Sequence, residues 1–338
     1  MKSVRTSKPG TVEVVELDRP EPGPQDVLLR IRACGICGTD TAMVVQGGAP
    51  FTPGELTTVH LGHEPAGEIV AVGAEVTGLS VGDRVVVNPM DGPSGLMGCG
   101  GPQGAMSEYV LIEKAELGKS LLIIPNDVPF AVAALNEPMA VAKHAVNRSD
   151  AEPSDKVVVF GAGPIGLGAA IWLKLRGVEH VVVVDILPER LDKALVIGAD
   201  AVINSAQEDV AARLTELHGA SANALGQPRP GTDIYIDAAG AGAVLETVQA
   251  SAKWGAELVI VAVHKEPVDI SGILRSELTI IASMGYPTEI FEVTPDLAAH
   301  WQRFATLISH QVPFTDVHKA YELATTPGAA DKVVVTFE

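Results

Sequence analysis

Short apolar runs separated by glycine and proline fill the first part of the chain. The clearest are Asp26–Arg32, Ala66–Val72 and Asp83–Val87, which are rich in valine, isoleucine and leucine. Runs of this length and composition between turn residues are typical of β-strands. The chain up to about residue 135 is therefore predicted to be β-rich.

The pattern changes over residues 136–148, where apolar residues recur with helical spacing. From Ser154 onward, strand-like and helix-like segments alternate. We expect strands at Lys156–Phe160, Val181–Asp185, Ile234–Ala238, Leu258–Val263 and Leu278–Ala282, and helices at Pro164–Arg176 and Pro188–Ile197. Strands separated by helices predict an α/β fold with a doubly wound parallel (Rossmann) sheet.

Residues 157–173 carry no charge and approach the length of a membrane-spanning helix. Four glycines and Pro164 interrupt this stretch after its first few residues, so a buried strand, a tight turn and a helix explain it better. The N-terminal residues lack the apolar segment of a secretion signal. We therefore expect neither membrane insertion nor export.

From about Tyr286 the pattern returns to helix and short strand, and it ends in the apolar run Lys332–Phe337. Because chain termini often lie close together, this tail is expected to rejoin the first domain. The 338 residues suit two domains. We predict a β-rich domain of residues 1–146 and 286–338, and a dinucleotide-binding domain of residues 147–285.

Composition narrows the possible partners. The 24 basic and 42 acidic residues give a net charge of −18, and aromatic residues make up only 4%. Such a surface repels phosphate backbones and offers few rings for base stacking, which argues against a nucleic-acid partner. The three cysteines, Cys34, Cys37 and Cys99, cannot staple a secreted domain. An odd count indicates a cytoplasmic protein with a metal or thiol role.

Gly161, Gly163 and Gly166 form a G-x-G-x-x-G motif between a predicted strand and a predicted helix. This context is typical of dinucleotide binding: the glycines permit a tight turn and close approach of a pyrophosphate. Pro164 and Ile165 open the helix, whose free N–H groups favour phosphate. The alternative is an ordinary strand–helix turn.

Asp185 ends the next strand, where a carboxylate can accept hydrogen bonds from the adenosine ribose and repel a 2′-phosphate. NAD(H) is therefore expected rather than NADP(H). Arg190 follows on the next helix and could contact the ribose or phosphate edge. The alternative for Asp185 is a helix cap.

Four residues have the chemistry of zinc ligands, namely Cys37, His63, Glu64 and Glu137. Their sequence separations follow no compact metal-binding rule. Taken singly, each has an ordinary structural explanation, such as a buried thiol, a hydrogen-bonded turn residue or a charge in the first turn of a helix.

Several motifs occur in a fixed order: CGICGTD at 34–40, GHEPAGEIVAVG at 62–73, VGDRV at 81–85 and NEPMA at 136–140, ahead of GAGPIG at 161–166. Together they resemble the zinc-containing medium-chain dehydrogenase/reductase (alcohol dehydrogenase) family over nearly the whole chain. The Glu-Pro at 137–138 is most similar to the sorbitol, 2,3-butanediol and threonine dehydrogenase branch. The resemblance implies a GroES-like catalytic domain beside the Rossmann domain.

The resemblance also implies roles for individual residues. Cys37 and His63 would supply a thiolate and an imidazole to one catalytic zinc. Glu64 would bind that zinc directly or lie close behind it, and Glu137 would bind it directly or through water. Zinc would act as a Lewis acid on an alcohol, Thr39 would take the alcohol proton, and NAD(H) would exchange the hydride.

The sequence departs from the family pattern in two places. Ala42 occupies the position of a proton-relay histidine, so Thr39 would pass its proton to water, to the cofactor ribose or to another side chain. His60 is one candidate, although a core or pocket-wall histidine is the simpler interpretation. Only Cys99 lies where other members hold a second zinc with four cysteines, so we expect no structural zinc, Cys99 as a plain loop residue and Cys34 as a buried thiol.

The implied substrate is a secondary alcohol, diol or polyol, or the matching ketone. Apolar segments at 44–51, 97–106 and 284–290 are expected to line its pocket. The apolar strand Glu277–Ser283 could pair with a partner subunit, and the resemblance implies a homotetramer or homodimer. The alternatives are a zinc-free NADPH-dependent quinone or enone reductase and a non-catalytic NAD-binding protein.

Overall fold

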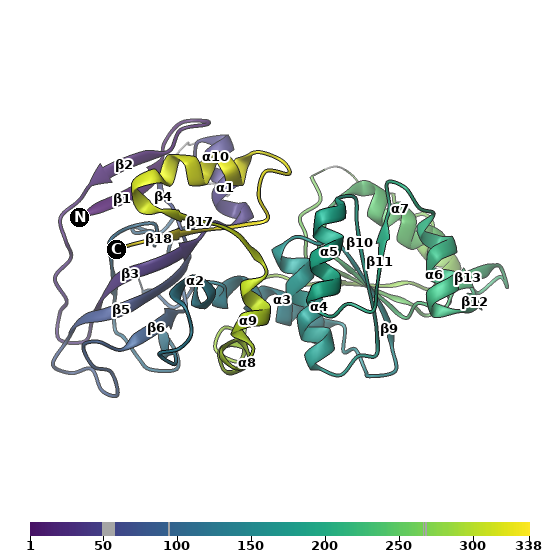
Figure 1. Ribbon diagram of the computed structural model, residues 1–338, viewed down its shortest axis with the longest axis horizontal. Coiled ribbons are helices and arrows are strands. Elements are labelled where there is room, and N and C mark those ends of the chain that lie inside the picture. The colour runs from purple at the N-terminus through teal and green to yellow at the C-terminus, as the bar shows by residue number, and fades with distance from the viewer. Residues whose placement is uncertain (49–57, 94, 266, 268) are drawn as a thin grey trace. The chain divides into compact units, whose positions relative to one another are not determined.

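The computed structural model describes residues 1–48, 58–93, 95–265, 267 and 269–338. Backbone packing divides the chain into two units (Figure 1). Unit 1 comprises Met1–Pro138 and Ile290–Glu338, and unit 2 comprises Met139–Glu289. The first boundary falls inside helix α3 (Asn136–Arg148), eight residues before the predicted one (146 − 138 = 8).

Unit 1 is built mainly on a seven-stranded sheet in the order β17-β18-β3-β5-β6-β8, with β7 paired to β3. Strands β3 (Val27–Gly35), β5 (Glu64–Val72) and β6 (Arg84–Val87) correspond to the three apolar runs predicted as strands. Strand β18 (Lys332–Thr336) pairs antiparallel with β3. The C-terminal tail therefore completes a sheet that begins near the N-terminus.

Unit 1 also contains further strands and several helices. The other strands are β1 (Lys2–Thr6), β2 (Glu13–Glu16), β4 (Val59–His60), β7 (Tyr109–Ile112), β8 (Leu121–Ile123) and β17 (Ile308–Pro313), of which β2, β1 and β4 form a separate sheet. The helices are α1 (Gly38–Gln46), α2 (Phe130–Ala133), α8 (Val293–Ala299), α9 (Trp301–Ala305), α10 (Val317–Thr325) and the 3-10 turn η2 (Phe314–Asp316).

The core of unit 1 contains several residues that were predicted from the sequence to line the substrate pocket. Val44, Met97 and Met106 are buried in the same apolar cluster as the residues of β3 and β5. Met284 is instead 87% exposed. Residues 49–51 of the predicted wall lie outside the described residues. Val44 and Met106 therefore belong to the core of unit 1, Met97 also lines a small cavity with Gln103 and Leu111, and a substrate pocket along these segments stays a prediction.

Unit 2 contains a six-stranded sheet in the order β11-β10-β9-β14-β15-β16, and every neighbouring pair is parallel. Its strands are β9 (Lys156–Phe160), β10 (His180–Asp185), β11 (Ala201–Asn204), β14 (Ile234–Asp237), β15 (Glu257–Ile260) and β16 (Thr279–Ala282). The direction in which the strands are added reverses between β9 and β14, and such a switch point opens a crevice at the carboxyl edge. The doubly wound sheet is confirmed.

Helices connect these strands on both faces of the sheet. They are α4 (Pro164–Leu175), α5 (Pro188–Val196), α6 (Val210–His218) and α7 (Gly242–Ser251), with a 3-10 turn η1 (Ile273–Ser276). Val158 of β9 packs in one cluster with Leu214 of α6 and Val248 of α7. The adjacent Val159 points to the other face, where it approaches Gly166 of α4. This alternation is what a sheet buried on both faces requires.

A small antiparallel hairpin, β12 (Ala220–Ala222) with β13 (Pro228–Pro230), was not predicted, since three-residue strands show no periodicity. The uncharged stretch 157–173 forms β9, a turn and most of α4, as expected. Across the described part of the chain, every helix is too short or too polar to traverse a bilayer.

Candidate metal centre and cofactor turn

Helix α1 begins with Cys37, whose side chain caps it. The Sγ atom accepts a hydrogen bond from the Thr39 backbone N–H at 3.5 Å, and Asp40 Oδ2 accepts one from the Cys37 backbone N–H at 2.9 Å. This reciprocal arrangement is a capping box with cysteine in the usual place of serine or threonine. The sulfur is therefore held in a fixed position at the N-terminus of α1.

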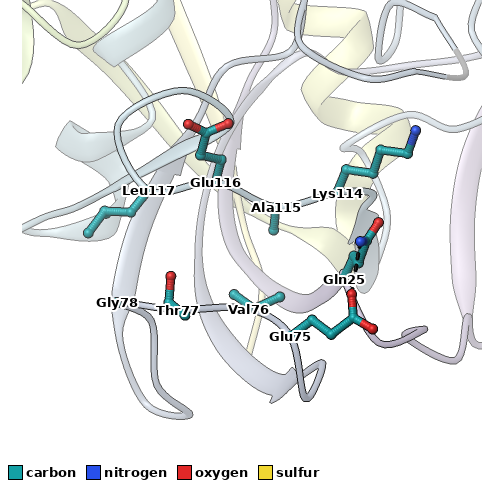
Figure 2. A pocket seen from close by; sticks show the side chains of 9 residues that line it. All are labelled: Gln25, Glu75, Val76, Thr77, Gly78, Lys114, Ala115, Glu116 and Leu117. Carbon is teal, nitrogen blue, oxygen red and sulfur yellow. Dashed lines mark hydrogen bonds between the residues drawn. The ribbon is translucent and has the colours of Figure 1, made fainter.

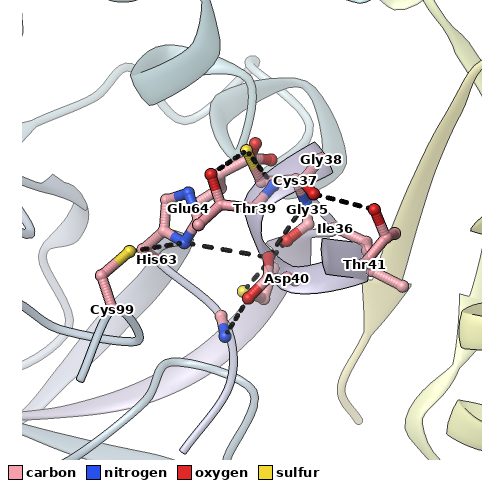
Figure 3. A network of polar contacts seen from close by, with 12 residues as sticks. Gly35, Ile36, Cys37, Gly38, Thr39, Asp40, Thr41, His63, Glu64 and Cys99 are labelled. Carbon is pink, nitrogen blue, oxygen red and sulfur yellow. Dashed lines mark hydrogen bonds and ion pairs between the residues drawn. The ribbon is translucent and has the colours of Figure 1, made fainter. Parts of the chain in front are cut away.

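Asp40 also fixes the segment that carries His63. Its Oδ1 accepts a hydrogen bond from the Gly62 N–H at 2.9 Å, and its Oδ2 lies 3.8 Å from His63 Nδ1 (Figure 3). Burial alone would lower the pKa of His63, but the negative charges of Asp40 and Cys37 raise that pKa well above its usual value. Sequence reasoning missed this role of Asp40, although the Cys37-x-x-Asp40 spacing signals a capping box.

One ligand atom from each of Cys37, His63 and Glu64 lies within 4.8 Å of the other two. His63 is 5% and Glu64 1% exposed. Glu64 Oε1 is buried and has no hydrogen-bond partner among the described residues. An orphaned buried carboxylate oxygen is costly, and a cation beside it would remove that cost. Thiolate, imidazole and carboxylate are zinc donors, so these residues fit a zinc ion.

Lys332, at the start of β18, neutralises the other oxygen of Glu64. Its ammonium group forms an ion pair with Glu64 Oε2 and donates to the Ile36 carbonyl at 3.0 Å. Lys332 is only 3% exposed. Burial alone would lower the pKa of Lys332, but Glu64 and Cys37 raise it. The sequence signal for this role is a single lysine at the start of an apolar strand, which no pattern separates from a surface lysine.

Glu137 is placed differently from the other three predicted ligands. It is 8% exposed in the first turn of α3, and its charge also raises the pKa of Lys332. It does not belong to the group of ligand atoms within 4.8 Å, which among the described residues comprises Cys37, His63 and Glu64. The structure thus brings three of the four predicted ligands together.

Thr39 lies beside the cluster. Its Oγ1 is 3.8 Å from Cys37 Sγ, and the residue is partly exposed. Ala42 follows one turn later in α1. His60 lies in β4 with its Nδ1 3.4 Å from Ser3 Oγ, and burial lowers its pKa.

The other two cysteines differ from each other. Cys34 is fully buried in β3, where burial raises its pKa, as expected of a structural thiol. Cys99 lies with its Sγ 3.6 Å from His63 Nδ1 (Figure 3). The prediction of a plain loop residue is therefore wrong for Cys99, because the loop folds back onto the histidine.

In unit 2, the glycine turn has the geometry that its motif predicts. Gly161 has φ +93°, in the left-handed region. A Cβ on Gly166 would lie 1.7 Å from the Gly161 carbonyl oxygen, so helix and strand meet without room for a side chain. Gly163 is the N-cap of α4, followed by Pro164 and Ile165, and a Cβ there would meet open space. The first N–H groups of α4 can therefore face a phosphate.

Asp185 ties the end of β10 to this turn. Its Oδ2 accepts a hydrogen bond from the Ala162 N–H at 2.7 Å, and its Oδ1 accepts one from the Ile186 N–H at 2.7 Å. Arg190 Nη1 lies 3.9 Å from Asp185 Oδ2. The N-cap of α5 is Leu187, so Asp185 is not the cap residue. The carboxylate is held at the carboxyl edge of the sheet beside the turn.

A polar groove of ≈ 510 Å³ lies elsewhere on unit 1 (Figure 2). It is lined by Gln25, residues 75–78 and residues 114–117, with a hydrogen bond of 2.9 Å from Gln25 to Glu75. None of the predicted site residues lines it. This groove is therefore separate from the candidate site.

Comparison with known proteins agrees with this geometry. The alcohol dehydrogenase GroES-like domain matches residues 23–125, and the zinc-binding dehydrogenase domain matches residues 164–300. These two segments cover more than half of the chain. The chain belongs to the zinc-containing medium-chain dehydrogenase/reductase family. This dehydrogenase is 33% identical over 308 residues to (R,R)-butanediol dehydrogenase of Bacillus subtilis (strain 168), covering 85% of each chain.

Solved structures show the same fold along the full chain. The crystal structure of 2R,3R-butanediol dehydrogenase from Bacillus subtilis matches this dehydrogenase with a TM-score of 0.86 and 28% identity over 99% of each chain. A short chain alcohol dehydrogenase from Escherichia coli CFT073, complexed with NADH, matches at 0.82 and 28%, covering 100% of this chain and 99% of that one. A zinc-binding dehydrogenase from Sinorhizobium meliloti 1021, bound to NADP, matches at 0.81 and 29%, covering 99% and 98%. The chain is an alcohol dehydrogenase by family.

Proposed function

We propose that this dehydrogenase binds one zinc ion through Cys37, His63 and Glu64 and transfers hydride between NAD(H) and a secondary alcohol, diol or polyol. The observation that carries this proposal is the buried cluster itself. Three zinc-type donors lie within 4.8 Å of one another, and a carboxylate oxygen among them has no hydrogen-bond partner in the part of the chain that the structure describes. The relative named as a butanediol dehydrogenase supports a vicinal diol or similar secondary alcohol as substrate.

Each residue has a task that follows from its contacts. Bound zinc would polarise the substrate oxygen as a Lewis acid. Asp40 orients His63 and the backbone of Cys37, as residues behind a metal ligand commonly do. Glu137, directly or through water, supplies a further carboxylate. Thr39, with its hydroxyl beside Cys37 Sγ, accepts the proton that the alcohol loses and passes its own hydroxyl proton on to water, to the cofactor ribose or to another side chain.

NAD(H) is proposed over NADP(H) because of Asp185. Its carboxylate stands where the adenosine ribose is held in folds of this type, and its charge opposes a 2′-phosphate. Arg190 is close enough to contact the same edge. The neighbours bound to NADH and to NADP show that related chains take either cofactor. We therefore attribute the preference of this chain for NAD(H) to Asp185.

Assembly is proposed to involve the sheet edge at β16. Ile280 on this strand is 39% exposed, and Leu274 just before it is 80% exposed. An exposed apolar edge strand is usually covered by a partner, so pairing with a second copy would give one interface of a homodimer or homotetramer. The three thiols, none in a disulfide, fit the reducing cytoplasm.

The test combines metal content with turnover on one sample. Dialysed protein is analysed for zinc and then assayed for NAD⁺ reduction against secondary alcohols, vicinal diols and polyols. One catalytic zinc per subunit with turnover is expected. Absence of zinc with no gain when zinc is added would overturn the proposal. NADPH with quinones would then test the zinc-free reductase, and NADH binding without any turnover would indicate a non-catalytic binder.

A further inference from the structure

A second carboxylate ends a strand at the carboxyl edge of the unit 2 sheet. Asp237, the last residue of β14, is 0% exposed. Its Oδ1 accepts hydrogen bonds from the Ala239 and Gly240 N–H groups, both at 2.9 Å. Its Oδ2 accepts one from His264 Nε2 at 2.7 Å. A buried charge with this many donors is well satisfied.

The backbone of Asp237 also fixes the loop that carries His264. Its carbonyl accepts hydrogen bonds from the N–H groups of Val261, at 3.0 Å, and Ala262, at 3.1 Å. The loop after β15 is therefore bound to β14 through the main chain as well as through the imidazole. The segment 261–264 is therefore bound to Asp237 at its start through the main chain and at its end through the imidazole of His264.

These loops adjoin the glycine turn. A Cβ on Gly161 would lie 3.1 Å from the Ala238 carbonyl, and a Cβ on Gly240 would lie 2.8 Å from the Val263 oxygen. The turn, the loop after β14 and the loop after β15 thus lie side by side along one edge. None of the sequence motifs used above includes Asp237 or His264.

The proposed NAD(H) site predicts which half of the cofactor lies over each part of this sheet edge. Asp185, on the β10 side of the turn, would hold the adenosine ribose, and the N-terminus of α4 would hold the pyrophosphate. In a doubly wound sheet the dinucleotide crosses the switch point, so its second half lies over the strands on the other side. Here those strands are β14 and β15, where Asp237 and His264 stand.

We propose that His264 is a binding residue for the nicotinamide riboside half of the cofactor, positioned by Asp237. The proposal rests on the NAD(H) function proposed above. Because the Asp237 carboxylate is a hydrogen-bond acceptor, Nε2 is the donor nitrogen of this contact, and Nδ1 is the ring nitrogen left to face the cofactor. The side chain is 12% exposed, and the described residues provide the ring with no second partner. Nδ1 accepts a hydrogen bond from a ribose hydroxyl or from the carboxamide NH₂.

The experiment compares two ligands that share the adenosine half. NADH and ADP-ribose are titrated into the full-length protein by calorimetry, because ADP-ribose lacks the nicotinamide ring and its amide. His264→Ala is expected to weaken NADH binding about tenfold, the effect of one lost hydrogen bond. ADP-ribose keeps the second ribose but lacks the carboxamide, so it should weaken with NADH if Nδ1 contacts the ribose and stay unchanged if Nδ1 contacts the carboxamide. Nicotinamide mononucleotide carries both groups and is titrated as well. It is expected to lose affinity by the same factor as NADH, whereas AMP is expected to be unaffected.

Two further variants make the result specific. Asp237→Asn keeps an acceptor for the two backbone N–H groups but offers an amide donor to His264 Nε2. The ring proton then moves to Nδ1, and NADH binding should fall as in His264→Ala while AMP binding is retained. ¹⁵N NMR of the imidazole reports this exchange of tautomers directly. His180→Gln, at the start of β10 on the opposite edge, is the matched control and should leave every affinity unchanged.

Three outcomes would overturn the proposal. NADH affinity could be unchanged in both His264→Ala and Asp237→Asn. NADH and AMP could be weakened by the same factor, which would make the pair a support for the whole sheet edge. Nicotinamide mononucleotide could leave the ¹⁵N signals of His264 unmoved in the wild type. Failure of wild-type protein to bind NADH and AMP at all would instead remove the proposed NAD(H) function, and this proposal with it.

Discussion

The metal cluster of unit 1 and the glycine turn of unit 2 achieve specificity in opposite ways. The cluster gathers charged side chains from distant parts of the sequence, and its Glu64–Lys332 pair joins residues 268 positions apart. The turn is six consecutive residues, and it works through backbone N–H groups and the absence of side chains. The metal cluster therefore requires an oppositely charged partner for each of its charged side chains. The glycine turn requires that no side chain fill the space beside its backbone.

The largest expected effect comes from breaking the cluster at its thiolate. Cys37→Ala should remove zinc and lower kcat/KM by about a thousandfold or more, since the Lewis acid is lost. NADH binding should persist, because the turn does not use this residue. Zinc analysis, steady-state kinetics and NADH titration measure the three quantities. Cys34→Ala, which removes a buried thiol outside the ligand set, should keep its zinc; full activity of Cys37→Ala would refute the metal assignment.

The next effect separates proton transfer from metal binding within the cluster. Thr39→Val should lower kcat about a hundredfold, because proton transfer by a positioned group contributes on that order. Zinc content and NADH affinity should stay unchanged. Thr41→Val is the control, since the Thr41 hydroxyl donates to the Gly38 carbonyl on the same helix and has no part in the cluster. Equal kcat values for Thr39→Val and the wild type would exclude the proposed role.

Removing the counterion tests whether the cluster is held by charge. Lys332→Met leaves Glu64 buried without its partner, which should cost about 3 kcal/mol of unfolding free energy in metal-free protein. Added zinc should restore part of this loss, because the ion supplies positive charge beside Glu64. Urea unfolding with chelator and with zinc measures both terms. Lys119→Met, at a 61% exposed lysine, should change little; a loss that zinc leaves unaltered would contradict the electrostatic explanation.

The smallest expected effect tests the one carboxylate that the cofactor turn depends on. Asp185→Ala should lower the preference for NAD over NADP by about tenfold, as expected when hydrogen bonds to a ribose are lost. The ratio of kcat/KM values for the two cofactors is the measurement. Asp192→Ala, on the exposed side of α5, changes the charge equally and should leave the ratio as it is. If both variants behave alike, overall charge rather than ribose contact sets the preference.

The same contrast explains what the sequence could predict. The turn was predictable to the residue, because strand, glycines and helix are neighbours in sequence and their sterics are local. Strand β15 was predicted to run to Val263, but it ends at Ile260. The N–H groups of the next two residues, Val261 and Ala262, both donate to the Asp237 carbonyl. No local pattern contains that contact.

The metal cluster needed the family resemblance. Spacing alone could not join Cys37 to His63 and Glu64. Asp40, Lys332 and Cys99 act through tertiary contacts that neither periodicity nor composition reports. Lys332 in particular becomes meaningful only when β18 lies beside β3 and brings its ammonium group to Glu64.

The pairing of β18 with β3 has a consequence for synthesis of the protein. Unit 2 is continuous in sequence, so all of it leaves the ribosome before the second segment of unit 1. Domains generally fold as units while the chain is being made. Unit 1, in contrast, receives the counterion of Glu64 only when residue 332 emerges, after the whole of unit 2 has been made. Until then Glu64 lacks that partner, so unit 2 can fold before the negative charge of the metal-binding cluster is balanced.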